Sequence, residues 1–258
     1  MVIECSLISD VGMLRQNNED NFYLNGKYRD NVEQKHIDIN ENFNIKVFLS
    51  AVFDGMGGEE YGELASLEAA KCLSEYQNVK FDQIVARYIN QANQAVCSKM
   101  YEVNSGRMGS TLAVVQIKKN KLNLCNVGDS PIYLFRNNQL KQLSVNHNEA
   151  QSLFDMGVIS KEELKYSKKK HRLTQHLGIF EHEMILEPFV LENMQLENQD
   201  YILLCSDGLT DMVDEEEISY ILSGKEDVRY KAEMLVNTAL ENGGKDNVTV
   251  MLIHFLDK

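Results

Sequence analysis

Apolar positions along the chain follow the two periods that distinguish strands from helices. Short apolar runs bounded by turn-forming residues predict strands. These runs are IECSLIS at 3–9, IKVFLSAVF at 45–53, STLAVVQI at 110–117, KLNLCNV at 121–127, PIYLFR at 131–136, YILLCS at 201–206 and NVTVMLIHF at 247–255. The segments QIKKNKLNL and LFRNNQLKQL place polar turns between apolar runs and therefore predict hairpins.

Other segments have the helical period. Apolar residues in the segment 81–103 fall at 81, 84, 85, 88, 89, 92, 95, 96, 100 and 103, which is one face of a helix. The segments from Glu60 to Tyr76 and from Val228 to Ala239 show the same spacing. The predicted helices fall in pairs between groups of hairpin strands. This order favours an α+β fold with antiparallel sheets over a doubly wound parallel sheet.

The chain gives no sign of a second domain. It has two prolines, no repeat and no linker-like stretch, and 43% of its 258 residues are hydrophobic. We therefore expect a single domain over residues 1–258. The one long polar stretch, residues 26–44, predicts a loop or a loose hairpin between two strands.

Charge and cysteine content narrow the class of function. There are 39 acidic and 26 basic residues, for a net charge of -13, whereas nucleic-acid-binding proteins carry a basic face, so we expect no nucleic-acid partner. The five cysteines are scattered and never spaced as C-x-x-C, which favours reduced thiols. A signal peptide and an apolar run of membrane-spanning length are both lacking. We expect a cytoplasmic protein that does not contact a membrane.

Acidic residues recur where the predicted strands begin or end, each beside a glycine or an asparagine. Any one Asp-Gly pair is typical of a β-turn. A set of such acids at strand ends instead favours a cation-binding site, because converging carboxylates repel one another unless cations neutralise them. Hard divalent ions such as Mg²⁺ and Mn²⁺ prefer oxygen ligands of this kind. The acids concerned are Glu19, Asp20, Asp54, Asp129, Asp207 and Asp246.

Taken in order, the motifs RQNNEDN, FDGMGG, MGSTL, NVGDS, CSDGLTD and GGKDNVTV resemble those of the metal-dependent protein phosphatase family, the type 2C serine/threonine phosphatases. The resemblance spans Gly12 to Val250, and FDMGVISKEELK followed by LTQHLG is similar to the compact bacterial branch. It implies a four-layer αββα sandwich, in which two antiparallel sheets lie between helix pairs. It also implies a flap beside the active site at about residues 146–178.

The resemblance implies a centre of two metal ions, Mn²⁺ or Mg²⁺. Asp54 would bridge the two ions, and the Gly55 carbonyl would be a further ligand. Asp207 and Asp246 would complete the ligands of one ion. Two ions held in this way would activate a water for in-line attack on phosphorus, with no phosphoenzyme.

The resemblance also implies roles for the residues around these two ions. Glu19 and Asp20 would act around the second ion, largely through bound waters, and Asp129 would help to hold a third, weaker ion. Arg15 would grip the substrate phosphate, for which a bidentate guanidinium is better suited than lysine. The catalytic residues would then be Arg15, Asp54 and Asp207, with Asn247 and Gly208 as supporting residues.

Other phosphatase and nucleotide motifs do not fit the chain. A cysteine phosphatase uses C-x5-R, yet the residues six positions after the cysteines are Val11, Asn78, Val103, Pro131 and Asp211. Neither Lys225 nor Lys245 lies in a P-loop. Ser110 and Thr111 have no partner base in the sequence and are interpreted as strand and turn residues.

The chain departs from the family pattern at a few positions. Met56 follows the Asp-Gly where eukaryotic relatives have histidine, so a water would protonate the leaving group. His147 and His171 are conceivable proton donors, although a packed or solvated histidine is the commoner case. Glu59 and Pro131 stand where the bacterial pattern usually has histidine and arginine. Neither change removes a metal ligand, so we expect an active enzyme.

We expect this enzyme to be a monomer that acts on phosphorylated proteins made by a cognate serine/threonine kinase. Two alternatives stay open. One is a stress- or sporulation-type phosphatase with one dedicated phosphoprotein regulator, and the other is an inactive metal-binding module that binds phosphoproteins. The basic patch SKKKHR, residues 167–172, predicts a solvated loop or a contact for acidic or phosphorylated substrates.

Overall fold

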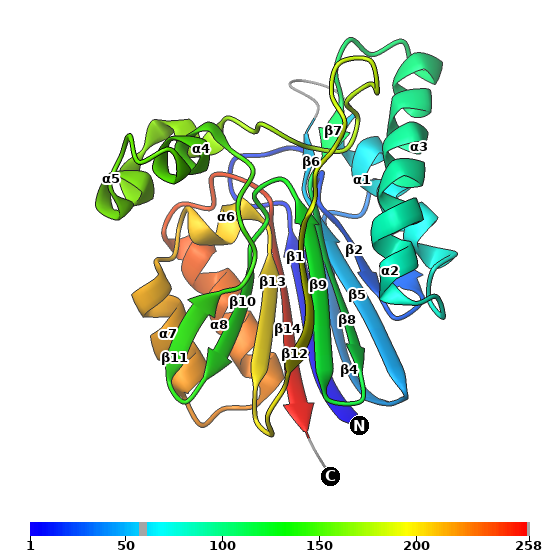
Figure 1. Cartoon of the computed structure of the whole chain (residues 1–258). Coiled ribbons are helices and arrows are strands. Elements are labelled where there is room, and N and C mark those ends of the chain that lie inside the picture. Colours follow the sequence, from blue (N-terminus) through cyan, green and yellow to red (C-terminus); the bar gives the residue numbers. More distant parts are fainter. Residues whose placement is uncertain (57–60, 257–258) are drawn as a thin grey trace.

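The computed structural model describes residues 1–56 and 61–256, and within them two six-stranded antiparallel sheets pack face to face (Figure 1). The first sheet has the order β11 (Gln139–Gln142), β10 (Ile132–Arg136), β13 (Tyr201–Cys205), β14 (Val248–Leu256), β1 (Val2–Asp10) and β4 (His36–Asn44). The second has the order β12 (Phe189–Gln195), β9 (Lys121–Val127), β8 (Leu112–Lys118), β5 (Val47–Phe53), β2 (Asn21–Leu24) and β3 (Lys27–Tyr28). The short strands β6 (Gly55–Met56) and β7 (Gly109–Ser110) form a separate pair.

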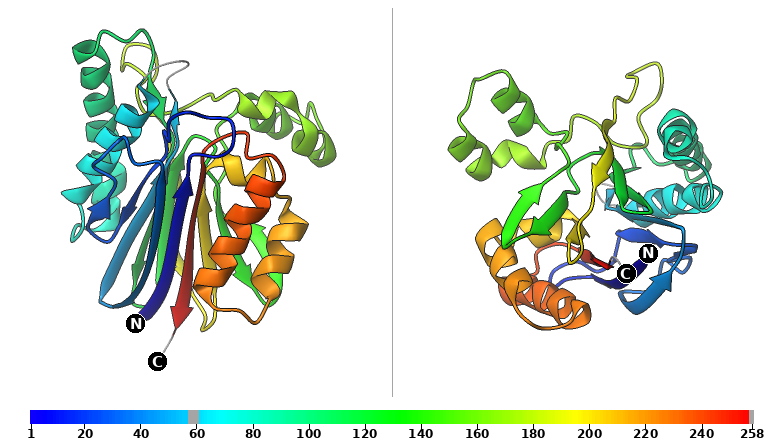
Figure 2. Two further views of the ribbon diagram at one scale, coloured as in Figure 1. Left: turned by 180° about the vertical axis from the view of Figure 1, so that it is seen from behind. Right: turned by 60° about the horizontal axis from the view of Figure 1, so that its bottom comes forward.

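Helices form the two outer layers (Figure 2). The first sheet is covered by α7 (Glu215–Ser223) and α8 (Val228–Glu241), and the second by α1 (Gly62–Ser74) and α3 (Ile89–Glu102). The predicted α+β sandwich with antiparallel sheets between helix pairs is therefore confirmed. The helix predicted over 81–103 is not regular, because α2 (Phe81–Gln83) and a π-helical turn, η1 (Ile84–Tyr88), precede α3. No helix in the described part of the chain has the length and apolar character that crossing a membrane requires.

The strand β14 of the first sheet is apolar on both faces. Along β14, Met251 and Ile253 belong to the core between the two sheets, whereas Val250 and Leu252 pack under α7 and α8. The sequence of a strand that is buried on both faces is a continuous apolar run, and for this reason β14 could be predicted from its sequence.

The prediction of a loop or loose hairpin over residues 26–44 is wrong in part. Residues 36–44 form β4, which pairs with β1 along its whole length, and β3 pairs with β2 in the other sheet. In β4, Ile37, Ile39 and Phe43 alternate with exposed polar residues. Because β4 is an edge strand with one solvated face, its apolar content is too low to stand out as a run. The strand β12 is a second one that the apolar pattern did not predict.

The buried carboxylate of Asp200 anchors the turn before β13. It accepts bonds from Arg136 Nε at 2.8 Å and Nη2 at 2.6 Å, and its side chain is 1% exposed. We expect Asp200→Asn to lower the free energy of unfolding by about 2 kcal/mol, because hydrogen bonds to charged groups contribute more than neutral ones. Urea denaturation measures this change. Asp155 is exposed, so Asp155→Asn is the control and should change the free energy of unfolding by less than about 0.5 kcal/mol. Equal stability of the wild type, Asp200→Asn and Asp155→Asn would contradict the prediction.

Candidate metal centre

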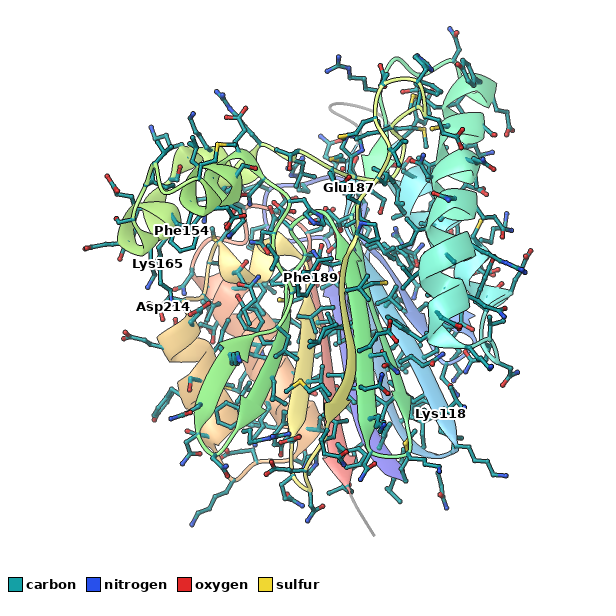
Figure 3. The ribbon with its side chains drawn as sticks, in the orientation of Figure 1. Lys118, Phe154, Lys165, Glu187, Phe189 and Asp214 are labelled. Atoms are coloured by element: carbon teal, nitrogen blue, oxygen red, sulfur yellow. The ribbon has the colours of Figure 1, made fainter. Side chains whose placement is uncertain are left out.

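The acidic strand ends meet at one end of the sandwich, beneath the segment 146–178, which we call the flap. Figure 3 shows Phe154 and Lys165 on the flap and Lys118 at the opposite end of the second sheet. A cavity of about 1080 Å³ opens beside the flap. Its lining includes most of the predicted site residues, namely Arg15, Glu19, Asp54, Gly55, Asp129, Asp207 and Asp246.

Each acid reaches the cavity from the end of a strand. Asp54 follows β5, and Asp129 lies two residues after the end of β9. Asp207 begins the short helix α6 (Asp207–Thr210) directly after β13, and Asp246 precedes β14. The antiparallel pairing of neighbouring strands therefore brings together residues that are far apart in the sequence.

Asp20 is the one predicted ligand that does not line the cavity. Its side chain lies in the wall behind it, 1% exposed, where its Oδ2 atom accepts bonds from Ser206 Oγ at 2.7 Å and from Thr249 Oγ1 at 2.6 Å. The sequence predicted the position of Asp20 at the start of a strand but not these two hydroxyl partners.

Glycine is required at two places where backbones approach closely. A Cβ atom on Gly55 would lie 2.3 Å from the Gly62 carbonyl oxygen and 2.4 Å from that of Glu19. A Cβ atom on Gly208 would lie 2.0 Å from the Asn247 carbonyl oxygen. These contacts place the backbone of Gly55 at the cavity and explain a supporting role for Gly208.

Thr111 fixes the backbone that carries Asp54. Its hydroxyl accepts the Asp54 N–H at 3.0 Å, and its own N–H donates to the Asp54 carbonyl at 2.9 Å. Ser130 Oγ lies 2.6 Å from the same hydroxyl. Thr111, the residue between β7 and β8, thus holds a candidate ligand in place.

Asn247 holds the loop that carries Arg15 and Glu19. Its Oδ1 accepts the Glu19 N–H at 2.7 Å. Its Nδ2 donates to the carbonyls of Val11 and Asn17, each at 2.9 Å. The side chain therefore links the segment 11–19 to the start of β14 and supports both predicted site residues.

The electrostatics of the acids fit bound cations. Burial raises the pKa of Asp20 to about 7 and that of Asp207 to about 6. It also raises the pKa of Asp54 and of Asp129 well above the ordinary value, and neighbouring carboxylates add to the effect. Carboxylates placed so close together are costly as anions unless positive charge compensates them. Because the donor set is carboxylate oxygen, hard divalent ions fit the site.

Arg15 lies at the rim of the cavity. Its Nη2 atom pairs with Asp246 Oδ2 at 2.7 Å, and its side chain is 52% exposed. A guanidinium that is half in solvent can reach a ligand that enters the cavity. This location agrees with the role that the family resemblance implies for Arg15.

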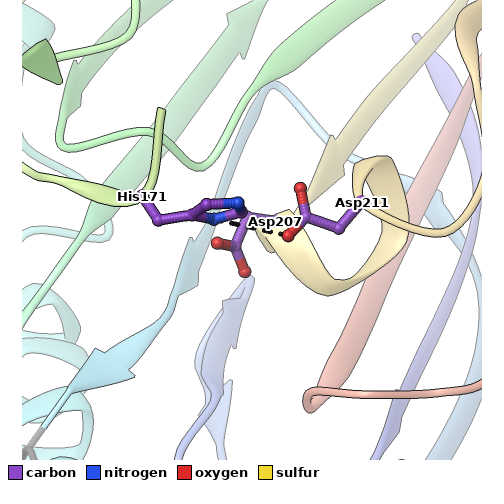
Figure 4. A group of neighbouring side chains, drawn as sticks. All are labelled: His171, Asp207 and Asp211. Atoms are coloured by element: carbon purple, nitrogen blue, oxygen red, sulfur yellow. Dashed lines mark ion pairs between the residues drawn. The ribbon is translucent and has the colours of Figure 1, made fainter. Parts of the chain in front are cut away.

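The flap contains α4 (Glu149–Asp155), α5 (Lys161–Tyr166) and a 3₁₀ turn, η2 (Lys168–His171). Lys170 Nζ contacts Asp211 Oδ1 at 2.7 Å, and His171 Nδ1 lies 3.5 Å from Asp211 Oδ2 (Figure 4). Two of the three remaining basic residues, Lys169 and Arg172, pair with Glu149 at 3.8 and 3.4 Å. Carboxylates of the same chain therefore balance much of the basic patch.

Asp211 is a site residue that the sequence reasoning missed. It lines the cavity, and ligand atoms of His171, Asp207 and Asp211 lie within 4.8 Å of one another. The signal was present in the motif CSDGLTD, because residues four apart share one face of a helical turn. The helix α6 places Asp211 beside Asp207 in this way.

The positions that depart from the family pattern and the two histidines considered as proton donors have different surroundings. Met56 and His171 line the cavity, whereas His147 is packed, with its Nδ1 atom accepting the Gly128 N–H at 3.1 Å. Pro131 precedes β10, and its carbonyl accepts the Cys205 N–H at 3.3 Å. Glu59 lies outside the described residues.

The fold and the acid-lined cavity belong to a known class of protein. The protein phosphatase 2C family matches residues 21–153, and the chain belongs to this family. The serine/threonine phosphatase stp of Listeria welshimeri is 34% identical over 254 residues, which cover 95% of this chain and 93% of the relative. The protein phosphatase PhpP of Streptococcus pneumoniae is 32% identical, with 97% of each chain covered.

Solved structures agree with this family membership. The serine/threonine phosphatase PstP/Ppp of Mycobacterium tuberculosis superposes with a TM-score of 0.82 at 29% identity and covers 100% of both chains. The catalytic domain of PstP in complex with 2 manganese ions superposes with a TM-score of 0.79 at 28% identity, again over 100% of both chains. These likenesses confirm the predicted fold and family.

Proposed function

We propose that this chain is a metal-dependent serine/threonine protein phosphatase that hydrolyses phosphoserine and phosphothreonine in proteins. The observation that carries the proposal is the convergence of carboxylates from separate strand ends on one cavity, with an arginine at its rim. Family membership supports it, and so do the similarities to the serine/threonine phosphatase stp and to the protein phosphatase PhpP. The manganese ions of the PstP complex support Mn²⁺, or the similarly hard Mg²⁺, as the cation.

In this proposal, the cavity residues divide between holding cations and binding substrate. The carboxylates of the cavity would hold divalent cations, whose chemistry when bound would be activation of a water and polarisation of the phosphoryl group. Arg15 binds the phosphate oxygens at the rim, and no side chain of the protein becomes phosphorylated. Thr111 and Asn247 set the positions of Asp54 and Glu19 before the substrate arrives. The proposed cation ligands are Glu19, Asp20, Asp54, Gly55, Asp129, Asp207 and Asp246.

The test is phosphate release from a phosphothreonine peptide with Mn²⁺, with Mg²⁺ and with excess chelator. We expect turnover with metal, a fall to background with chelator and recovery when Mn²⁺ is added back, because bound cations would lower the pKa of the attacking water. Asp207→Asn should lack turnover under every condition. The matched control, Asp155→Asn, carries the same chemical change on the exposed face of α4 and should keep full turnover.

Two results would contradict the proposal. A folded wild-type protein that is inactive with every metal would favour the inactive phosphoprotein-binding module. Turnover that persists in Asp207→Asn would place the activity at another site. A panel of phosphoproteins then separates a general phosphatase from one with a single dedicated regulator.

The finer features of this function are also proposals. The substrates are products of a cognate serine/threonine kinase, and the enzyme works as a monomer with residues 1–258 as one catalytic domain. A cytoplasmic location is supported by the five cysteines, all of which are free. Light scattering of the purified protein tests the monomer, and dephosphorylation of proteins that a co-expressed kinase has labelled tests the partnership.

A further inference from the structure

A row of buried hydroxyl groups lies behind the cavity wall and ends on Asp20. Ser206 Oγ and Thr249 Oγ1 both donate to the same atom of Asp20, Oδ2, at 2.7 and 2.6 Å. Both hydroxyl residues are fully buried, and Asp20 is 1% exposed. Because both bonds end on one oxygen, Oδ1 is left for a different partner.

The row continues through Ser9 to Asn18. Ser9 Oγ lies 2.7 Å from Thr249 Oγ1, and Asn18 Nδ2 donates to Ser9 Oγ at 3.0 Å. The Asn18 Oδ1 atom in turn accepts the Asp20 N–H at 3.1 Å. The hydrogen bonds thus form a closed ring that runs from the Asp20 backbone to its own carboxylate.

The inventory of protons fixes the direction of these bonds. The ionised carboxylate that a cation requires only accepts, so in that state the single hydroxyl proton of Thr249 is used on Asp20. Ser9 must then donate to Thr249, and the Asn18 amide donates to Ser9. Every hydroxyl of the ring gives its proton toward Asp20, and bonds aligned in one direction strengthen one another.

The ring joins Asp20, at the start of a strand of the second sheet, to strands of the first. Ser9 on β1 and Thr249 on β14 are paired in the strand register, and Ser206 follows β13. The Thr249 N–H donates to Ser206 Oγ at 2.9 Å, and the Ser206 N–H donates to the Thr249 carbonyl at 3.1 Å. The hydroxyls therefore come from three segments of the chain that are hydrogen-bonded side by side, β1, β14 and the residue after β13.

We propose that Ser9, Thr249 and Ser206 are positioning residues that hold Asp20 with one oxygen fixed and the other directed to the cations. This inference rests on the proposed metal centre. Partners that orient a ligand in this way typically account for about 10- to 100-fold in metal affinity. The competing interpretation is a polar network that only stabilises the first sheet, and it predicts no effect on metal affinity.

The test measures Mn²⁺ affinity by calorimetry on the full chain, with phosphate release titrated against Mn²⁺ as a second readout. Thr249→Val keeps the shape of the side chain and removes the hydroxyl, so we expect about 10- to 100-fold weaker Mn²⁺ binding. Thr249→Ser restores the hydroxyl and should bring the affinity back to within about threefold of wild type. Ser206→Ala removes the second donor and should weaken binding by a similar factor.

Ser6→Ala is the matched control. Ser6 lies on β1 with Ser9 and is fully buried, and its hydroxyl has no hydrogen-bond partner in the structure. This variant should bind Mn²⁺ as wild type does. If Thr249→Val does not fold, Ser206→Ala and Ser9→Ala carry the test with the same expected loss.

Each outcome decides between the two interpretations. Wild-type Mn²⁺ affinity in Thr249→Val and Ser206→Ala would overturn the inference and leave the proposed function intact. An equal loss of Mn²⁺ affinity in these variants and in Ser6→Ala would also overturn the inference. It would show that any change in the buried polar groups of the first sheet weakens Mn²⁺ binding. A wild-type protein that binds no Mn²⁺ would overturn the proposed metal centre and this inference together.

Discussion

Asp54→Asn is expected to lower the metal-dependent kcat/KM at least about 10³-fold. The stabilisation that a metal ion gives to transition-state charge is worth several kcal/mol, and about 4 kcal/mol corresponds to a factor of about 10³. Among the acidic residues of the cavity, Asp54 is the one whose substitution should lower metal-dependent kcat/KM most. Its pKa is raised first by burial and then by Asp20, Asp207, Asp129 and Asp246, which places it at the centre of the acidic cluster.

The same substitution should stabilise the protein when chelator is present. The asparagine amide carries no charge, so it removes the repulsion that Asp54 shares with its neighbours. We expect the thermal midpoint in chelator to rise by about 3 °C or more, and the further rise on adding Mn²⁺ to be lost. Differential scanning calorimetry with and without Mn²⁺ measures both changes. A variant that keeps its Mn²⁺-dependent rise would show that Asp54 does not hold a cation.

The sequence predicted the fold where strands are buried on both faces. Strands such as β5, β8 and β14 are continuous apolar runs, and their ends were placed within a few residues. The edge strand β4 was not predicted, because its solvated face is polar and its sequence therefore contains no continuous apolar run. The strand β12 contains a register shift between Leu191 and Met194, which interrupts the alternation that would predict it.

The candidate site was predictable where it is carried by motifs. The acids at strand ends lie next to glycine or asparagine, and that local signature can be found without knowing the fold. Ser9, Thr249 and Ser206 have no such signature, because a serine or threonine at a strand end is common. Their relation to Asp20 depends on the register between β1 and β14, which pairs residues 240 positions apart. Long-range register of this kind cannot be inferred from local patterns.

Arg15→Ala is expected to lower kcat/KM about 10²-fold, mainly through a higher KM. Hydrogen bonds from a guanidinium to a phosphate are charge-assisted, and losing about 3 kcal/mol of them corresponds to about 10²-fold. Arg15→Lys should recover only part of the loss, since lysine cannot form the two parallel bonds of the guanidinium. Steady-state kinetics on a phosphothreonine peptide at saturating Mn²⁺ give kcat and KM for each variant.

The Arg15 variants are expected to bind Mn²⁺ as the wild type does or more tightly, whereas variants of the carboxylate ligands are expected to lose Mn²⁺. The Arg15–Asp246 ion pair has side chains that are 52% and 41% exposed, so its loss should cost at most about 1 kcal/mol of stability. Removing a positive charge beside Asp246 cannot weaken its attraction for a cation, so Mn²⁺ affinity should equal or exceed that of wild type. Arg107→Ala, at an exposed arginine outside the cavity lining, is the control and should leave KM unchanged. An Arg15→Ala protein with wild-type KM would show that the substrate phosphate is bound by other residues of the cavity.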